Sequence, residues 1–330
     1  MRHCAPDALF LIRSAVLASI IAASGTVHAQ DGAQDGAQDG TEDEVKQIAE
    51  SEGPGMVLSL DLTGRFAAKA DFDSTSGGTI ESTSFGADLG IMIPIDDRAR
   101  LMLTFGVGIT DYDITPPVGA VGTTAATVGT QFDTVMEYTF NGMYSRSIND
   151  KTSFFVGGGV GFAAEGGGSD AFIWNALGGF SHKVNPKLSV GLGVGVFSRI
   201  EDDILILPLP QISYQIDDYW SIGSKGPGAR LNYKWSDELE MGIQAMFDGK
   251  SFRIDDDNTL VPDGAVNISG VPVSYYLDYK GGETSRVSVF AEVGVVLGAS
   301  MEVLNSMGNT IIDEDIDPSV FVGAGLKIEF

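Results

Sequence analysis

The chain has 330 residues, with 45 acidic and 20 basic side chains and a formal net charge of −25 at pH 7. This acidity argues against a basic patch that binds nucleic acid or anionic lipid, so no nucleic-acid partner is expected. The single cysteine, Cys4, excludes an intramolecular disulfide and a cysteine metal site. No cofactor is expected.

Residues 1–29 have the features of a secretory signal peptide. Arg2 and Arg13 precede an apolar run over 14–23, and small residues before and at Ala29 offer a cleavage point. The run is well below the ~20 residues that a spanning helix needs. We therefore expect cleavage after Ala29 and export of the remaining chain.

Residues 30–55 are predicted to be an acidic, low-complexity spacer. The segment 30–40 repeats Asp-Gly-Ala-Gln and cannot bury a core. The capping-box pattern that begins at Thr41 predicts a short helix to about Glu52. This helix is either a plug or a periplasmic docking element, or a frayed helix in a tail. The last reading is favoured because so short a helix is marginal alone.

From Met56 to Phe330 apolar and polar residues alternate with a period of two, which predicts a single all-β domain. Many segments exceed the ~5–6 residues of soluble strands and match the ~9–11 that cross a bilayer. The clearest segments are 58–66, 85–93, 101–109, 132–140, 154–162, 172–180, 188–196, 287–297 and 317–330. The pattern predicts a transmembrane antiparallel up-and-down β-barrel over 56–330.

Tight turns alternate with looser segments along this domain, which is typical of outer-membrane barrels. The predicted tight turns are 96–98, 149–150, 185–186, 217–218, 236–237 and 281–282, and the looser segments are 71–78, 114–130, 165–170, 201–203, 255–264 and 305–315. Counting gives about 14 strands if 220–223 and 229–234 form a hairpin across Gly226-Pro227-Gly228. The alternative is 12 strands.

Aromatic residues gather beside the tight turns, where a barrel places its periplasmic girdle. They are Tyr144, Phe154, Phe180, Tyr219, Trp220, Trp235 and Phe330. The alternative interpretation is the core of a large β-sandwich. We favour the girdle because a sandwich core does not require aromatics gathered at one level.

The last stretch, 317–330, alternates to its final residue and ends on an aromatic. Gly325, Ile328 and Phe330 resemble the C-terminal signal by which bacterial outer-membrane barrels are recognised for assembly, although an aromatic is usual where Ile328 stands. With the signal peptide and the strand rhythm, the chain resembles bacterial outer-membrane β-barrel proteins, in particular families of unknown function. The resemblance implies contact with outer-membrane lipid and lipopolysaccharide, and with the barrel assembly machinery through this strand.

Catalytic or metal chemistry finds little support in the chain. After residue 29 the only histidine is His182, and its neighbour Ser181 should face the opposite side of a strand. The glycine run 157–161 lacks the Lys-Ser/Thr of a phosphate loop and suits a curved strand. The acidic groups 255–257 and 313–317 lack the order of an EF-hand, and are read as solvated charges or, less favourably, as divalent bridges to lipopolysaccharide.

Charged residues on the polar face of the strands are expected to point into the lumen, because a basic group in lipid would cost ~2–4 kcal/mol near the midplane. The lumen candidates are Asp61, Arg65, Asp88, Glu137, Arg199, Arg230, Lys234, Glu240, Asp278, Arg286 and Glu292. Both signs occur, so the interior is either a sealed, ion-paired one or a water-filled path. The leading prediction is a porin-like channel or small-solute uptake protein with a weak cation preference, its solute unspecified. The alternative is a non-transporting barrel that acts through its loops in adhesion or envelope structure, and an enzyme ranks third.

Overall fold

The computed structural model describes residues 55–73, 77–115, 134–166, 171–258, 261–282 and 286–330. The predicted signal peptide and the predicted helix over 41–52 lie outside these ranges, as does most of the looser segment 114–130. Within the described part of the chain, no helix combines the length and apolarity needed to cross a membrane.

The described residues form β-strands almost throughout, as the period of two predicts. The strands are β1 (Val57–Asp71), β2 (Thr79–Asp96), β3 (Ala99–Thr115), β4 (Val135–Asn149), β5 (Thr152–Glu165), β6 (Phe172–Asn185), β7 (Leu188–Arg199), β8 (Asp202–Gln215), β9 (Trp220–Lys225), β10 (Gly228–Lys234), β11 (Leu239–Met246), β12 (Asp248–Arg253), β13 (Ala265–Lys280), β14 (Val287–Leu304), β15 (Thr310–Ile316) and β16 (Ser319–Glu329).

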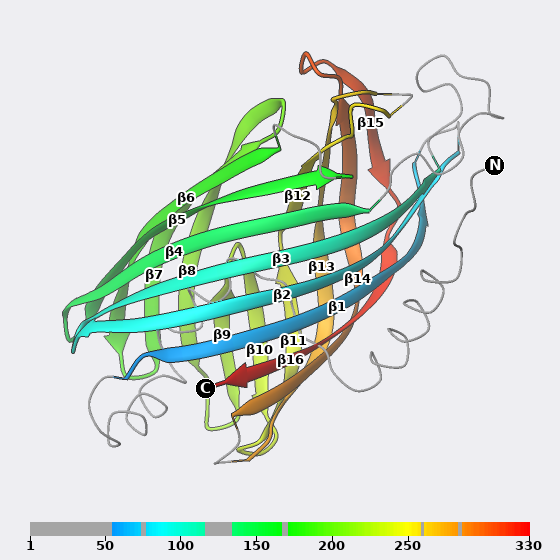
Figure 1. The fold of residues 1–330 in the computed structure, drawn as a ribbon. Coiled ribbons are helices and arrows are strands. Elements are labelled where there is room, and N and C mark those ends of the chain that lie inside the picture. Colours follow the sequence, from blue (N-terminus) through cyan, green and yellow to red (C-terminus); the bar gives the residue numbers. More distant parts are fainter. Residues whose placement is uncertain (1–54, 74–76, 116–133, 167–170, 259–260, 283–285) are drawn as a thin grey trace.

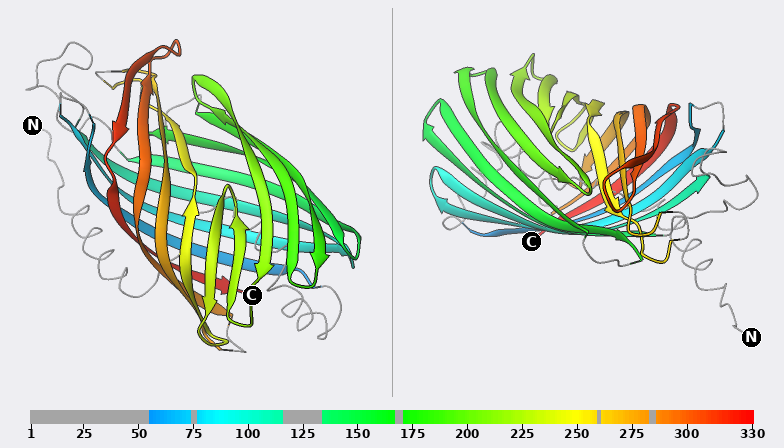
Figure 2. Two further views of the ribbon diagram at one scale, coloured as in Figure 1. Left: turned by 180° about the vertical axis from the view of Figure 1, so that it is seen from behind. Right: turned by 90° about the horizontal axis from the view of Figure 1, so that it is seen from above.

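The sheet closes on itself into a 14-strand antiparallel barrel (Figure 1). Strands β1 to β11 pair in sequence, β11 pairs with β13, β13 with β14 and β14 with β16, and β16 returns to β1. The predicted barrel and its strand number are confirmed, and 220–223 and 229–234 lie in the predicted hairpin, β9–β10. The predicted tight turns gather at one end of the barrel, the turn end, and the longer connections lie at the other, the loop end (Figure 2). The prediction of a loose segment at 201–203 was wrong, because β7 and β8 are joined at the loop end by a turn of only two residues, Ile200 and Glu201.

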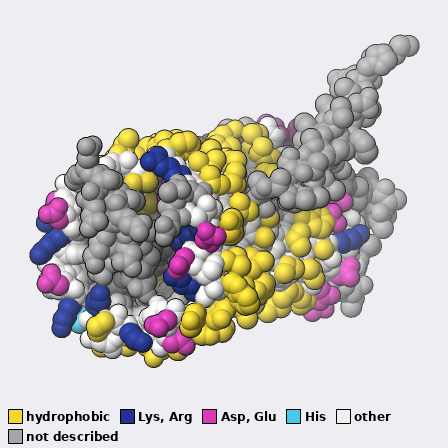
Figure 3. All heavy atoms as spheres, turned by 90° about the horizontal axis from the view of Figure 1, so that it is seen from below, with side chains coloured by type: hydrophobic (Ala, Val, Ile, Leu, Met, Phe, Trp, Pro, Cys, Tyr) yellow, Lys and Arg dark blue, Asp and Glu magenta, His cyan; other side chains and the backbone are white. Residues whose placement is uncertain are grey.

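The outer surface of the barrel is apolar over its middle. On β7, Val190, Leu192 and Val194 are exposed while Ser189 is buried, because successive side chains face opposite sides of the wall. Figure 3 shows hydrophobic side chains over the middle of the visible surface and charged ones toward both ends. A soluble protein would rarely expose such a continuous apolar surface.

Aromatic rings cluster at the turn end. The ring centroid of Tyr233 lies 4.7 Å from that of Trp220, 6.2 Å from that of Trp235 and 6.3 Å from that of Tyr219. Three of the aromatics singled out in the sequence therefore surround one that was not. They sit at the base of the β9–β10 hairpin and of the turn that follows it.

The loop end contains a packed hydrophobic core. Ile114 of β3, Val266 of β13 and Met301 and Val303 of β14 have no exposed surface, and neither has Ile254 just after β12. These side chains come from wall strands far apart in the chain and from the segment inside the barrel. The core therefore fills the loop end with apolar side chains.

The segment 305–315 was predicted to be a loose connection, and most of it is strand β15. Residues Ala299–Leu304 of β14 pair with it, and Ile312 and Ile316 are buried in the loop-end core. Asp313 and Asp315 between them are exposed. The acidic residues give this strand the composition of a loop, although its three isoleucines pack in or against the loop-end core.

β12 is an additional strand inside the barrel that the sequence did not predict. It pairs with the first six residues of β13 and makes one parallel bridge, Arg253 to Ala164 of β5. Because β5 lies on the other side of the closed sheet from β13, the short strand crosses the lumen. It divides the interior between the loop-end core and the space toward the turn end.

Candidate transport lumen

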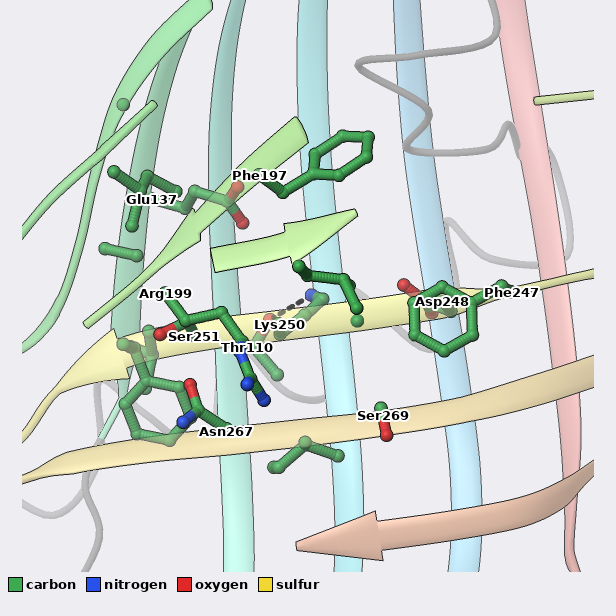
Figure 4. Close-up of a pocket in the computed structure, with 18 of the residues that line it drawn as sticks. Thr110, Glu137, Phe197, Arg199, Phe247, Asp248, Lys250, Ser251, Asn267 and Ser269 are labelled. Carbon is green, nitrogen blue, oxygen red and sulfur yellow. Dashed lines mark hydrogen bonds between the residues drawn. The ribbon is translucent and has the colours of Figure 1, made fainter. Parts of the chain in front are cut away.

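A cavity of about 560 Å³ lies against β12 inside the barrel. Its lining comes from β1, β3, β4, β7, β8, β12 and β13, among other strands, so it belongs to the lumen and not to a surface groove. Figure 4 shows β12 running across the strands of the opposite wall, with the labelled side chains around it. The volume falls within the ~300–1,000 Å³ of typical small-molecule sites.

One side of the cavity is polar and holds β12 in place. The Lys250 ammonium donates a hydrogen bond to Thr110 Oγ1 of β3 at 3.3 Å (Figure 4), and Asp248 Oδ2 lies 3.5 Å from the guanidinium of Arg65 on β1. That guanidinium carbon is also 3.8 Å from the ring centroid of Phe321. β12 is therefore held to the opposite wall by these polar contacts as well as by the stacking of Phe252 on Tyr112 of β3.

The opposite side of the cavity is apolar. Leu205 and Leu207 of β8 line it, while Ile204 and Ile206, which alternate with them, are exposed on the outside of the barrel. β8 is thus apolar on both faces, which a barrel strand beside a water-filled lumen would not need. The apolar side is completed by Phe197, Pro227, Met246 and Phe247.

The turn between β7 and β8 is bound to β12 and β13 above the cavity. The Ile200 N–H donates to Ser251 Oγ at 2.9 Å, and the Arg253 guanidinium lies 2.8 Å from Glu201 Oε1. Asn267 Nδ2 of β13 also donates to Asp202 Oδ2 at 3.1 Å. With the loop-end core, these contacts close the described part of the barrel on the side of the longer connections.

Some of the predicted lumen charges line the cavity. Arg65, Glu137, Arg199 and Glu292 do so. Arg199 lies at the loop end of β7, where its guanidinium is 2.6 Å from Asp202 Oδ2. The sequence placed these residues on the polar face of their strands, and in the structure they come from β1, β4, β7 and β14.

Two other predicted lumen charges, Arg230 and Glu240, and Glu292 of the cavity lining belong to hydrogen-bonded clusters in the wall. The Arg230 guanidinium carbon is 3.7 Å from the ring centroid of Tyr276, and the Tyr276 hydroxyl lies 3.1 Å from Glu240 Oε1. Glu292 accepts hydrogen bonds at one oxygen from Gln244 Nε2 at 3.0 Å and from Ser274 Oγ at 2.8 Å. These groups stabilise the wall around β9–β14 through their partners.

The remaining candidates are spread along the barrel. Asp61 and Asp88 are opposite each other in the β1–β2 register, and Asp88 is buried. Asp278 is paired in register with Glu240 and is half-buried. Two basic residues lie at the turn end, away from the cavity: Lys234, whose ammonium is 2.7 Å from an Asp237 carboxylate oxygen, and the exposed Arg286.

The C-terminal residues sit where the barrel closes. β16 lies between β1 and β14, with Gly325 opposite Thr63 and Ile328 opposite Leu60. The Phe330 N–H donates to Leu58 O at 2.9 Å, and its side chain is exposed at the turn end. The recognition of this strand by the assembly machinery stays a prediction.

Ser181 and His182 face opposite sides of β6. Ser181 is buried, whereas His182 is exposed and its Nδ1 lies 3.0 Å from Thr152 Oγ1. Among the described residues no three His, Cys, Asp or Glu side chains are grouped so as to hold a metal ion. The geometry therefore does not bring Ser181 and His182 together.

Several lining residues escaped the sequence analysis. Lys250, Asp248 and Phe247 belong to the crossing segment, whose alternation is too short to recognise. Leu205 and Leu207 could have been found, because the run Ile-Leu-Ile-Leu-Pro-Leu-Pro over 204–210 is apolar at odd and even positions alike. Such a run in a barrel predicts an apolar patch in the lumen.

No family model and no curated protein matches the chain. Among solved structures, a mutant of the TodX monoaromatic hydrocarbon channel is similar at 10% identity and a TM-score of 0.47, over 86% of this chain and 92% of that one. An outer membrane channel from Pseudomonas putida F1 has the same identity and TM-score, over 85% and 97%. The KdgM porin has 10% identity and a TM-score of 0.36, over 82% and 99%. These values assign the chain to no family, so its function has to be inferred from its own residues.

Proposed function

We propose that the chain is an outer-membrane channel that takes up small solutes through the barrel lumen, with a weak preference for cations. The observation that carries this proposal is the cavity of about 560 Å³ inside a closed barrel whose outer middle is apolar. The strand order closes on itself, so each wall strand pairs with a neighbour on both sides over at least part of its length, and such pairing is what allows strands to cross lipid. The 14 to 18 residues of β1 to β6 exceed the ~9–11 that cross a bilayer.

The proposed orientation places the turn end in the periplasm. Short turns face the periplasm and longer connections the outside in bacterial barrels. Tyr219, Trp220, Tyr233 and Trp235 would then sit at the inner boundary between lipid and headgroups. The outer leaflet, with its lipopolysaccharide, would surround the loop end, and the closing strand β16 would present Phe330 to the assembly machinery.

The packed loop end limits the size of the solute. A general porin has a wide axial path, whereas the described loop end here is filled by buried side chains of β3, β12, β13 and β14. The polar contacts of β12 narrow the lumen further. The lumen therefore suits a molecule the size of a small-molecule ligand better than an oligomer.

The charges on the cavity wall support a weak cation preference. Five acidic residues line it against three basic ones: Glu137, Asp248, Glu292, Glu302 and Asp313 against Arg65, Arg199 and Lys250. Acidic groups raise the local cation concentration within a Debye length of ~8 Å at physiological salt. Because both signs are present, the preference should be small. It should also fade as salt rises, because salt shortens the Debye length.

Conductance and flux measurements test this function. We expect purified barrel in a planar bilayer to conduct and, under a KCl gradient, to show a reversal potential of cationic sign. We expect liposomes that contain it to swell in small neutral sugars and not in oligosaccharides. A reversal potential of anionic sign would contradict the charge argument, and swelling in oligosaccharides would contradict the narrow lumen.

The packed loop-end core also supports the second candidate, a barrel that does not transport and acts through its loops. A protein of this kind needs a rigid platform, and the contacts of Glu201 with Arg253 and of Ile200 with Ser251 provide one. Absence of both conductance and swelling from barrel shown to be folded would favour this candidate over the channel.

A further inference from the structure

The barrel wall is low at β9, β10 and β11. These strands have 6, 7 and 8 residues, whereas β7, β8 and β13 nearby have 12, 14 and 16. At ~3.3 Å per residue and a tilt of ~40°, β9 rises roughly 13 Å, about half of a ~25 Å apolar band. Figure 2 shows the short hairpin between longer strands. Its tip, Gly226-Pro227, therefore lies near the middle of the membrane.

β8 has a free edge above this hairpin. β9 pairs only with Ser213–Gln215 of β8, and no described strand pairs with the preceding residues on that side. The Ile212 N–H donates to Ser224 Oγ of β9 at 2.8 Å, so the even-numbered amides of β8 point toward the free side. Pro208 and Pro210 are also at even-numbered positions, and proline has no N–H to present on that side. The edge thus carries fewer donors and is a poor partner for another strand.

The free edge forms one side of a framed gap. The tip of the β9–β10 hairpin is its lower border, where Phe247 N–H donates to Pro227 O at 3.4 Å. Met246 at the end of β11 and Phe247, which joins β11 to β12, form the other side. The β7–β8 turn, bound to β12 through Ile200 and Ser251, closes the gap above.

The cavity reaches this frame. Its lining includes Leu205 and Leu207 from the free-edged strand, Pro227 from the hairpin tip and Met246 and Phe247 from the far side. On the outer face of the same strand, Ile204 and Ile206 are exposed at 53% and 60%. Beside the frame, β8 is therefore apolar on its cavity face as well as on its lipid face.

We infer that this gap is a lateral opening, through which a small, largely apolar molecule with one polar end passes between the outer leaflet and the lumen. The inference rests on the proposed channel function and adds the route and the class of solute. The apolar side of the cavity, at Leu205, Leu207 and Phe197, would receive the body of the molecule. Thr110 and Lys250 on the opposite side would receive its polar end.

Uptake of an apolar probe tests the route. In a Gram-negative host, the lipopolysaccharide leaflet slows the uptake of 1-N-phenylnaphthylamine, whose fluorescence rises when it reaches the lipid beneath. We expect the barrel to raise this rate several-fold over host cells that lack it. Leu207→Trp should abolish most of the increase, because the indole would fill the cavity beside the frame. Ile206→Trp is the matched control, since that side chain is on the lipid face of the same strand.

The folding of each variant is measured in parallel with uptake. Each variant is compared at equal amounts of folded barrel, judged by heat-modifiable gel mobility. If Leu207→Trp does not fold, Leu205→Phe with its control Ile204→Phe repeats the comparison at the next pair of positions. Leu207→Ala should do the opposite and raise uptake, because it widens the frame.

The outcomes separate the inference from the function on which it rests. Equal uptake by Leu207→Trp and Ile206→Trp would overturn the lateral opening. The lateral opening would also be overturned if cells with the wild-type barrel took up the apolar probe no faster than host cells without it, while liposomes with the barrel still swelled in small sugars. In that case the channel function would hold, with an axial route in place of the lateral one. If neither the apolar probe nor a sugar passes, the proposed channel itself is wrong.

Discussion

The two sides of the barrel wall are built from strands of very different length. β2, in the tall side formed by β1 to β6, has 18 residues, whereas β9, in the low side formed by β9 to β11, has 6. Glycines pack against neighbouring backbone on both sides, as at Gly159 of β5 and Gly242 of β11. The low side differs in its buried polar side chains, where Lys225 of β9 donates to Gln244 of β11 and Gln244 donates to Glu292 of β14. Close backbone packing is therefore found on both sides, whereas buried side-chain hydrogen bonds support the part of the wall that cannot span the membrane.

On the tall side, we expect added side-chain volume to be the most damaging change. A Cβ at Gly159 would collide with the Asn141 amide oxygen and lie 2.8 Å from the Phe140 carbonyl oxygen. We expect Gly159→Ala to prevent assembly or to lower the free energy of unfolding by about 1–3 kcal/mol, because backbone cannot move aside. Urea unfolding of the reconstituted barrel measures this. Gly178→Ala, whose Cβ would meet only Phe155 O at 3.5 Å, is the control and should be tolerated.

The low side should be most sensitive to loss of a buried acceptor. Glu292→Ala would leave Gln244 Nε2 and Ser274 Oγ without their shared carboxylate oxygen. Unpaired buried donors cost about 1–3 kcal/mol, so urea unfolding should shift by this amount. The control is Glu329→Ala, which removes an exposed ion pair with Lys327, expected to contribute ~0–1 kcal/mol. Equal effects of the two variants would show that the buried cluster does not stabilise this side.

The crossing strand should affect ion selectivity more than stability. Lys250→Gln removes one of the three basic groups from the cavity wall but keeps a polar side chain at this position. With less positive charge on the wall, the cation preference should become stronger. The reversal potential under a KCl gradient measures the change. Lys234→Gln, at the turn end outside the cavity lining, should change it less. A larger effect of Lys234→Gln would place the selective region at the turn-end mouth.

The smallest effect is expected at the β8–β9 turn, where the low side begins. Asp217 Oδ1 accepts hydrogen bonds from the N–H groups of Tyr219 and Trp220, both at 2.8 Å, and these bonds lower the pKa of Asp217 below its ordinary 3.8. A depressed pKa contributes stability above the unfolded value and loses it as pH falls through the folded value.

In an Asp217→Asn variant, the side-chain amide oxygen would accept the same bonds without titrating. We therefore expect the wild-type barrel to lose its slight advantage in urea unfolding over this variant as pH falls below 3.8. A stability difference that stays constant across this pH range would contradict the assignment.

The sequence predicts the wall better than the interior. A strand between lipid and lumen must alternate, so the strand number and the β9–β10 hairpin could be read from period and turns. β12 touches no lipid, and its sequence Asp-Gly-Lys-Ser-Phe-Arg has a single large apolar side chain and no alternation to recognise, so it was missed. Alternation also gives the face of a residue and not its depth, which is why Arg65 lines the cavity and Lys234 lies at the turn end. The loop-end core arises from single residues on many strands and leaves no local pattern.

The prolines of β8 also bear on association between barrels. An unpaired strand edge is a template on which another chain can add a strand. Pro208 and Pro210 place no N–H on the free edge at their positions, and Ser224 occupies the amide of Ile212 below them. A second barrel diffusing in the same leaflet would find a flank at which few intermolecular strand pairs can form. The two prolines on the free edge of β8 thus also disfavour edge-to-edge oligomers at this flank.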